Sequence, residues 1–232
     1  SYVVVLGALA TIDRRRMVPR PLATRAKGGI REALAYVRSR PDVRRPLLVM
    51  TVVGTVALNF GTTIPSMVRF GFDRGAGAVG AAMSVSAIGS ILGGVYIAGI
   101  TPHPRRTLGL VLAGFGTMLI AFAVAPTYLA FVALSIPLGF ASASFQSVDT
   151  VVLQQATEPS MQGRVMALQQ MAWFGSTPIG ALVMGWVIEA SSPRMPFVLG
   201  SLSAFVCAVV LIRPAREPDL AAVAVEASSP VG

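Results

Sequence analysis

Asp149 is the residue whose type and position most directly suggest chemistry, because it is the only acid well inside a long apolar run. It lies seven residues before Ala156, which in a helix places it about 10 Å from the end of that run. Ser142 and Gln146 precede it at helical spacing and share its face. A carboxylate in an apolar span costs at least about 2.5 kcal/mol unless it is protonated or paired. We expect Asp149 to exchange protons or hold a cationic group; the alternatives are pairing with Arg164 and contact with interfacial water.

A second polar stripe runs along an earlier apolar run, with members at intervals of four, four, three and four residues. Its members are Thr51, Thr55, Asn59, Thr62 and Ser66. Polar side chains are unfavourable in contact with lipid, so we expect this stripe to face protein or a water-filled cavity. The alternative is that the hydroxyl groups only bond back to their own helix or to a neighbouring one.

Two adjacent amides, Gln169 and Gln170, lie near the start of a further apolar run. We expect one of them to face the same cavity, and the sequence does not decide which. Glu189 lies at the opposite end of that run, where a solvated position is expected.

The residue inventory argues against an enzyme. His103 lies between two prolines and Cys207 lies in an apolar run, so no metal cluster and no pair of nucleophile and base is apparent. The sequence also lacks the G-x-x-x-x-G-K-[ST] phosphate-binding pattern. We therefore expect no catalytic residue, no cofactor and no metal site.

The elements that must position these side chains are six long apolar runs, each able to cross about 30 Å of hydrocarbon with roughly 20 helical residues. With 54% hydrophobic residues, 12% charged residues and a mean hydropathy of +0.70, the chain has too little polar surface for a globule in water. The sequence therefore predicts an all-α polytopic membrane protein. The runs are Pro46 to Val68, Gly75 to Ile100, Thr107 to Ala125, Thr127 to Ala156, Val165 to Ala190 and Pro196 to Ile212.

Basic residues alternate between the gaps that separate these runs. Sixteen of the nineteen Lys and Arg residues fall in every second gap, and eleven of those lie between Asp13 and Arg45. Basic segments stay in the cytoplasm, so the first loop and the C-terminus are predicted to be inside. The net charge of +9 lies beside apolar runs, which favours contact with the lipid bilayer over a nucleic-acid partner. Lys27 is the only lysine, a bias typical of GC-rich bacterial genomes and hence of a bacterial inner membrane.

Four segments follow from this pattern. Residues 1–12 resemble the end of a transmembrane helix whose beginning is missing, and residues 13–45 form a basic cytoplasmic linker. Within the linker, Ile30, Leu34 and Val37 share one helical face, which predicts a short interfacial helix. Residues 46–212 are the six-helix bundle, in which Gly89 and Gly93 allow close helix packing. Residues 213–232 are expected to be disordered.

Two segments carry a resemblance to a known family. Residues 163–168 read GRVMAL, residues 175–180 read GSTPIG and Gly185 follows. The linker segment from Arg31 to Leu47 reads REALAYVRSRPDVRRPL. Together they resemble the C-terminal half, helices seven to twelve, of a major facilitator superfamily transporter. The similarity is to the branch with the enterobactin exporter and the macrolide efflux proteins.

The resemblance implies a secondary transporter that exports drug-like or siderophore-like small molecules by alternating access, with proton coupling. It also implies a missing N-terminal six-helix half, because such carriers rock two halves around a site at the membrane midplane. Arg105, Arg106 and Arg164 would then belong to cytoplasmic loops that take part in gating. The loop before Arg105 departs from the family signature, since it contains no acid.

Two other functions fit the same pattern of runs. A non-transporting membrane protein could keep the half-fold as an assembly module. The chain could also be the six-helix membrane domain of an ATP-driven exporter with a separate ATPase. Short inner loops argue against the second, because such domains extend their helices far into the cytoplasm.

Overall fold

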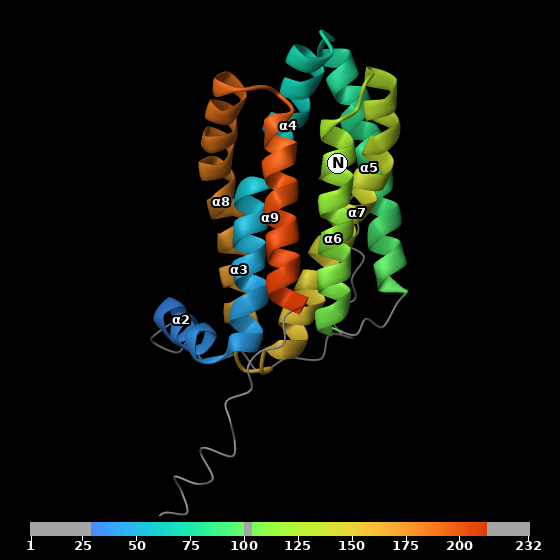
Figure 1. Cartoon of the computed structure of the whole chain (residues 1–232). Helices are drawn as coiled ribbons and strands as arrows, with labels where there is room; N and C mark the ends of the chain where they lie inside the picture. Colours follow the sequence, from blue (N-terminus) through green and yellow to red (C-terminus); the bar gives the residue numbers. More distant parts are fainter. Residues whose placement is uncertain (1–28, 100–103, 213–232) are drawn as a thin grey trace, which may run out of the picture.

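The computed structural model describes residues 29–99 and 104–212, and all regular structure in them is helical (Figure 1). The predicted segments 1–12 and 213–232, and most of the linker, lie outside these described residues. The helices are α2 (Gly29–Ser39), α3 (Pro41–Val56), α4 (Phe60–Ser66), a π-helix (Met67–Gly71), α5 (Ala76–Ala98), α6 (Pro104–Ala123), α7 (Tyr128–Ala156), α8 (Gln162–Ala190) and α9 (Met195–Ile212).

Five stretches of this structure are long and apolar enough to cross a membrane, and the last helix, α9, is apolar but shorter. Each predicted run corresponds to one of these elements, with ends that differ by a few residues. The predicted fold class, an all-α polytopic membrane protein, is therefore confirmed. The agreement follows from length and hydropathy, which are local properties of the chain.

The prediction of one continuous helix from Pro46 to Val68 is wrong. Helix α3 starts earlier, at Pro41, and ends at Val56; α4 begins at Phe60 and continues into the π-helix. Pro41 occupies the first turn of α3, where proline's missing N–H removes no hydrogen bond. The break falls at residues 57–59, which contain no proline or glycine from which it could be predicted.

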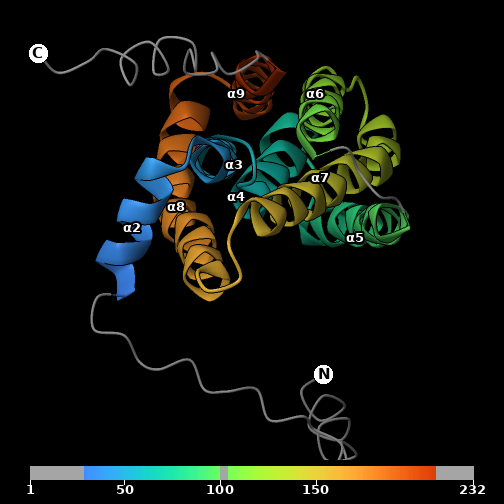
Figure 2. The same cartoon turned by 90° about the horizontal axis from the view of Figure 1, so that it is seen from below.

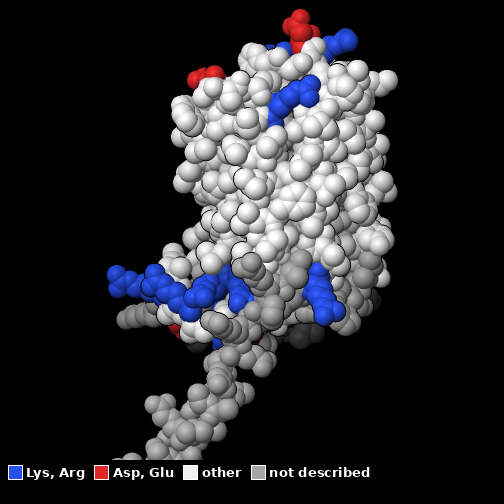
Figure 3. Space-filling view, in the orientation of Figure 1, with Lys and Arg blue, Asp and Glu red and all other residues white. Residues whose placement is uncertain are grey.

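Helices α3 and α4 and the π-helix continue in one direction as a single span, and the successive spanning stretches run in opposite directions (Figures 1 and 2). In the view of Figure 3, Arg side chains concentrate at the end where α2 lies, and an uncharged surface separates them from the few charges at the other end. Arg69, Arg74 and Arg194 belong to the far end. The face in view thus has the charge-free middle zone that a hydrocarbon layer requires.

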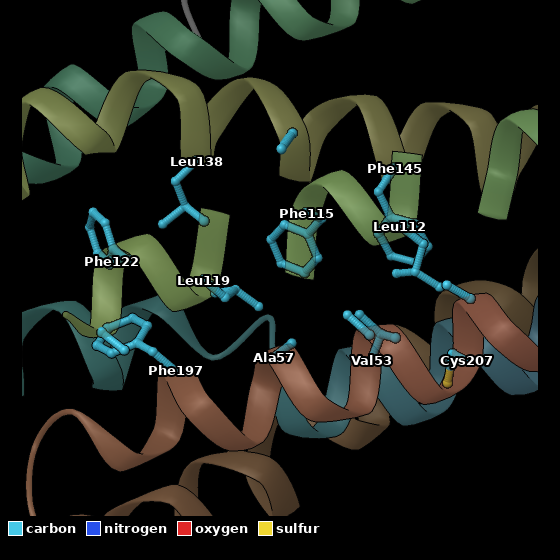
Figure 4. Packing of buried hydrophobic residues seen from close by; sticks show 14 of the residues in the cluster. Val53, Ala57, Leu112, Phe115, Leu119, Phe122, Leu138, Phe145, Phe197 and Cys207 are labelled. Atoms are coloured by element: carbon cyan, nitrogen blue, oxygen red, sulfur yellow. The ribbon is translucent and has the colours of Figure 1, made fainter. Parts of the chain in front are cut away.

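An apolar core holds α3, α6, α7 and α9 together (Figure 4). Its largest side chains are phenylalanines from three helices, and Phe122 packs against Phe131 with tilted rings whose centroids are 3.9 Å apart. Phe115 and Phe145 lie parallel at 6.0 Å, and Phe197 of α9 closes the group. This core fixes the rotation of α7, the helix that carries Asp149.

Helices α5 and α7 approach each other through small residues. Gly89 and Gly93 face the backbone carbonyl groups of Ile136 and Phe140, and Gly139 faces Ser86 in return. The Ser90 hydroxyl donates to the Gly139 carbonyl oxygen at 3.3 Å across the same contact. The predicted packing role of Gly89 and Gly93 is confirmed, with α7 as the partner helix.

A methyl group at Gly89 is expected to separate these helices, because a Cβ there would overlap with the Ile136 carbonyl oxygen. We expect Gly89→Ala to lower the free energy of unfolding by about 1–3 kcal/mol. Gly94→Ala is the matched control on the same helix, since nothing lies within 4 Å of its added Cβ. Thermal unfolding in detergent measures both, and equal midpoints would contradict the assigned contact.

Helix α2 lies across the start of α8 (Figure 2). Ala33 and Val37 are buried against the bundle, whereas Ile30 and Leu34 are 56% and 40% exposed. The predicted short helix in the linker is therefore present, but its apolar residues divide between two environments. Val37 packs against the bundle, whereas Ile30 and Leu34 are exposed on the outside of it.

Candidate functional site

Asp149 and Gln169 meet between α7 and α8. The Gln169 Nε2 atom donates to Asp149 Oδ2 at 3.0 Å and to the Thr150 hydroxyl oxygen at 3.3 Å. Each residue is seven positions from the helix end nearest the α7–α8 turn, so both lie at the same depth, about 10 Å along the axis. Antiparallel helices joined by a short turn bring such positions together.

The carboxyl group of Asp149 is enclosed by this chain's own helices. Its exposed fraction is 0%, and that of Gln169 is 3%. Among the described residues, Asp149 Oδ1 has no hydrogen-bond partner. A buried carboxyl with one hydrogen-bonded oxygen and one free oxygen can take up a proton at the free oxygen. That oxygen can also accept a hydrogen bond from a water molecule or a cationic group.

The two alternatives for Asp149 disagree with this geometry. Arg164 pairs instead with Glu32 of α2, with Arg164 Nη1 2.9 Å from Glu32 Oε1. Contact with interfacial water does not fit a fully buried side chain. Gln169, which the sequence did not link to Asp149, is the neighbour that matters. The missed signal was the equal distance of the two residues from the α7–α8 turn.

The other members of the α7 stripe bond back to their own helix. Ser142 is buried and donates to the Gly139 carbonyl oxygen at 3.0 Å, and Gln146 is half-buried and donates to the Ser142 carbonyl oxygen at 3.2 Å. The Thr150 hydroxyl donates to the Gln146 carbonyl oxygen at 2.9 Å. Thr150 thus extends the stripe and joins it to Gln169, a contact that sequence spacing alone did not reveal.

Asn59 sits in the break between α3 and α4. Its Nδ2 atom donates to the Thr55 carbonyl oxygen at 2.6 Å and to the Gly54 carbonyl oxygen at 3.4 Å. The last carbonyl groups of a helix lack partners within it, so the amide terminates α3. Asn59 is 3% exposed, and its Oδ1 atom has no partner among the described residues. Non-helical backbone at membrane depth is tolerated only where protein or water satisfies it.

The hydroxyl groups of the α3–α4 stripe bond back to their own helix. Thr51 donates to Leu47, Thr55 to Thr51 and Ser66 to Thr62, in each case to the carbonyl oxygen four residues earlier. These bonds match the alternative of back-bonded hydroxyl groups. They leave the oxygen lone pairs of half-buried Thr51, Thr55 and Ser66 available to other donors.

Helix α8 packs against this stripe through small residues. Gly180 faces the Thr55 carbonyl oxygen and the Asn59 amide, and Gly54 faces the Ser176 hydroxyl oxygen. The part of the stripe around Thr55 and Asn59 therefore packs against α8 and does not line an open cavity. Along α8, Gly180 is eleven residues from Gln169, so the Asn59 and Asp149 regions lie about 16 Å apart in depth.

The remaining predicted site residues lie away from this contact. Gln170 is exposed on another face of α8, and Glu189 is exposed near the far end, as expected. Arg106 is exposed at the start of α6, and the side chain of Arg105 lies outside the described part. Within residues 29–99 and 104–212, no group of three His, Cys, Asp or Glu side chains could hold a metal ion.

Comparison with known families decides the membership of the chain. The family model described as Major Facilitator Superfamily matches residues 102–231, more than half of the chain. The chain belongs to the Major Facilitator Superfamily. A comparison with curated proteins found no match.

A solved structure shares the fold. The E. coli fucose:proton symporter, FucP, matches 91% of this major facilitator chain with a TM-score of 0.63 and 18% sequence identity. The match covers 53% of the symporter, so the chain spans about half the length of that protein. At this identity the likeness concerns the helix arrangement and not the transported molecule.

Proposed function

We propose that this chain is the C-terminal half of a proton-coupled secondary transporter that exports drug-like or siderophore-like small molecules by alternating access. Membership of the superfamily supports transport. The sequence segments at residues 163–168 and 175–180 support the efflux branch. The buried contact between Asp149 and Gln169 carries the proposal of proton coupling.

Asp149 would carry the proton. When ionised, its Oδ2 atom accepts from Gln169 Nε2, as in the structure. Uptake of a proton removes the net charge from an apolar span and turns the carboxyl into a donor as well as an acceptor. Gln169 offers both a donor and an acceptor, so it can pair with either form after its amide rotates. The proton would thereby change how α7 and α8 bind each other.

The substrate cavity would form beside these helices. Its proposed lining comprises Thr51, Thr55, Asn59, Thr62, Ser66, Ser142, Gln146, Gln169 and Gln170. The break between α3 and α4 at Asn59 favours a cavity here, since transporters expose backbone and amide groups to a substrate where helices are interrupted. Gln146 and Thr51 are half-buried within this chain and thus remain accessible from one side.

A second six-helix bundle, N-terminal to this one, is the proposed partner. Only 17% of the spanning window is buried in α5 and in α8, against 39% or more in the other three spanning stretches. In Figure 2 these two helices lie toward opposite sides of the bundle. Large apolar side chains of α8, including Phe174, Leu182 and Trp186, are exposed. Partner helices and lipid would cover them.

The end that carries α2 would face the cytoplasm of a bacterial inner membrane. The concentration of basic residues there supports this orientation. Arg164 ties the start of α8 to α2 through Glu32, and Arg40 pairs with Glu158 of the α7–α8 turn. We assign a gating role at this end to Arg105, Arg106 and Arg164, because opening the inner side would move these loops.

The test is transport by the full-length protein in sealed lipid vesicles. Vesicles carrying a pH gradient are incubated with cationic dyes, macrolides and catecholate siderophores, and a known proton antiporter serves as the positive control. We expect one substrate class to accumulate against its gradient while protons move in the opposite direction. Protons that move with the substrate would contradict export by antiport. No transport of any compound, with an active positive control, would contradict the proposal as a whole.

A further inference from the structure

An apolar groove lies between α3 and α9, on a side of the bundle that the transport proposal does not use. Its volume is about 180 Å³, and it starts at Arg45 near the inner end. Its walls are Leu48, Val49, Val52, Cys207, Val210 and Leu211. Val49 and Cys207 are buried and form its floor, whereas Leu48, Val52 and Val210 are 42–55% exposed. Figures 1 and 2 both place α3 and α9 next to each other.

The depth of the groove matches the acyl region of a bilayer. Val52 lies seven residues beyond Arg45, which is about 10 Å along the helix axis. In the orientation proposed above, the mouth would lie at headgroup level and the walls would extend into hydrocarbon. No water is present there to fill an apolar groove, so a hydrocarbon chain is its natural occupant.

The mouth of the groove selects the headgroup by charge. Arg45 is half-buried, and the adjacent Arg44 is exposed. A guanidinium group binds phosphate oxygens with two parallel hydrogen bonds. Asp42, one turn earlier, lines a neighbouring cavity of about 210 Å³ that Arg45 also lines. Among the described residues that line the groove, Arg45 carries the only charge.

We propose that the α3–α9 groove binds one anionic phospholipid of the inner leaflet, with an acyl chain along Leu48 and Val52 and its phosphate at Arg45. The site joins the first and last spanning helices of the bundle. It differs from the Asp149 region in position and in chemistry; it rests on the proposed orientation of the bundle but not on transport.

Native mass spectrometry of the full-length protein tests the site. The protein is released from bilayers of equal phosphatidylglycerol and phosphatidylcholine, and the lipid that stays bound is identified. We expect enrichment of phosphatidylglycerol in the wild type. Arg45→Gln should reduce this enrichment by about fivefold, the effect of one cation near an anionic headgroup. Val52→Trp should fill the groove and lower the retention of both lipids.

Two control variants separate the site from general lipid contact. Arg69→Gln removes an exposed cation at the far end, and Leu202→Trp adds bulk to an exposed position of α9 outside the groove. Both should bind lipid like the wild type. Deletion of residues 213–232 should also leave the enrichment unchanged. Increased lipid retention after the deletion would identify the tail as the occupant and overturn the proposal.

The wild type alone supplies a second measurement. Short-chain phosphatidylglycerol, added to the protein in detergent, should raise the unfolding temperature more than phosphatidylcholine does. Equal effects of the two lipids would overturn the proposal, as would unchanged enrichment in Arg45→Gln.

Discussion

Asp149→Asn is expected to abolish substrate accumulation driven by a pH gradient, down to the background of empty vesicles. Asparagine has nearly the same shape, and its Oδ1 atom can still accept from Gln169 Nε2, so the contact between α7 and α8 is kept. What the amide loses is the ability to take up and release a proton. Exchange of substrate without a gradient should therefore continue. Accumulation and exchange are measured in the same vesicles with the full-length protein.

The stability of Asp149→Asn gives an independent check. An acid in an apolar span costs at least about 2.5 kcal/mol on insertion scales, so its removal should not lower the unfolding temperature. Glu189→Gln is the matched control, because this acid is exposed near the far end of α8. It should accumulate substrate like the wild type. If Asp149→Asn also retains accumulation driven by the gradient, then proton coupling lies elsewhere.

Gly180→Ala is expected to destabilise the bundle and to stop transport. A Cβ at this position would overlap with the Thr55 carbonyl oxygen and with the Asn59 amide nitrogen. Helix α8 would have to move away from the break between α3 and α4. We expect a loss of about 1–3 kcal/mol in the free energy of unfolding, measured by thermal or chemical unfolding in detergent.

Gly185→Ala on the same helix distinguishes this contact from a general effect of glycine. Nothing lies within 4 Å of a Cβ at Gly185, so alanine there should stabilise the helix by about 0.5–1 kcal/mol. Opposite shifts of the two variants would support the contact between α8 and Asn59. Shifts of the same sign and size would show that α8 does not approach Asn59 in the folded protein.

The break at Asn59 shows why part of the fold was not predictable. Residues 46–68 read as one long apolar run that carries a polar stripe, and residues 57–59 contain no proline or glycine. The interruption depends on the Asn59 amide, which ends α3, and on Gly180, which is distant in sequence and leaves room for it. An asparagine in a polar stripe is equally compatible with an unbroken helix.

The site shows the same division. Spacing identified Asp149 as unusual and placed Ser142 and Gln146 on its face, because helical periodicity is a local property. The choice between Gln169 and Gln170 depended on the rotation of α8 relative to α7, which the core phenylalanines and the glycine contacts set. Similarly, the sequence offered Asp149 as a partner for Arg164, and only the docking of α2 brought Glu32 to it.

The sequence by itself determined the number of spanning elements, their alternating direction and the end that carries the basic residues. These properties follow from the length and hydropathy of each run and from where the charges lie between runs. Only the tertiary structure decided which oxygen of Asp149 is satisfied, where the first span is interrupted and which helices leave apolar faces uncovered. Those outcomes depend on the packing of residues far apart in the chain, which determines the rotation of each helix about its axis.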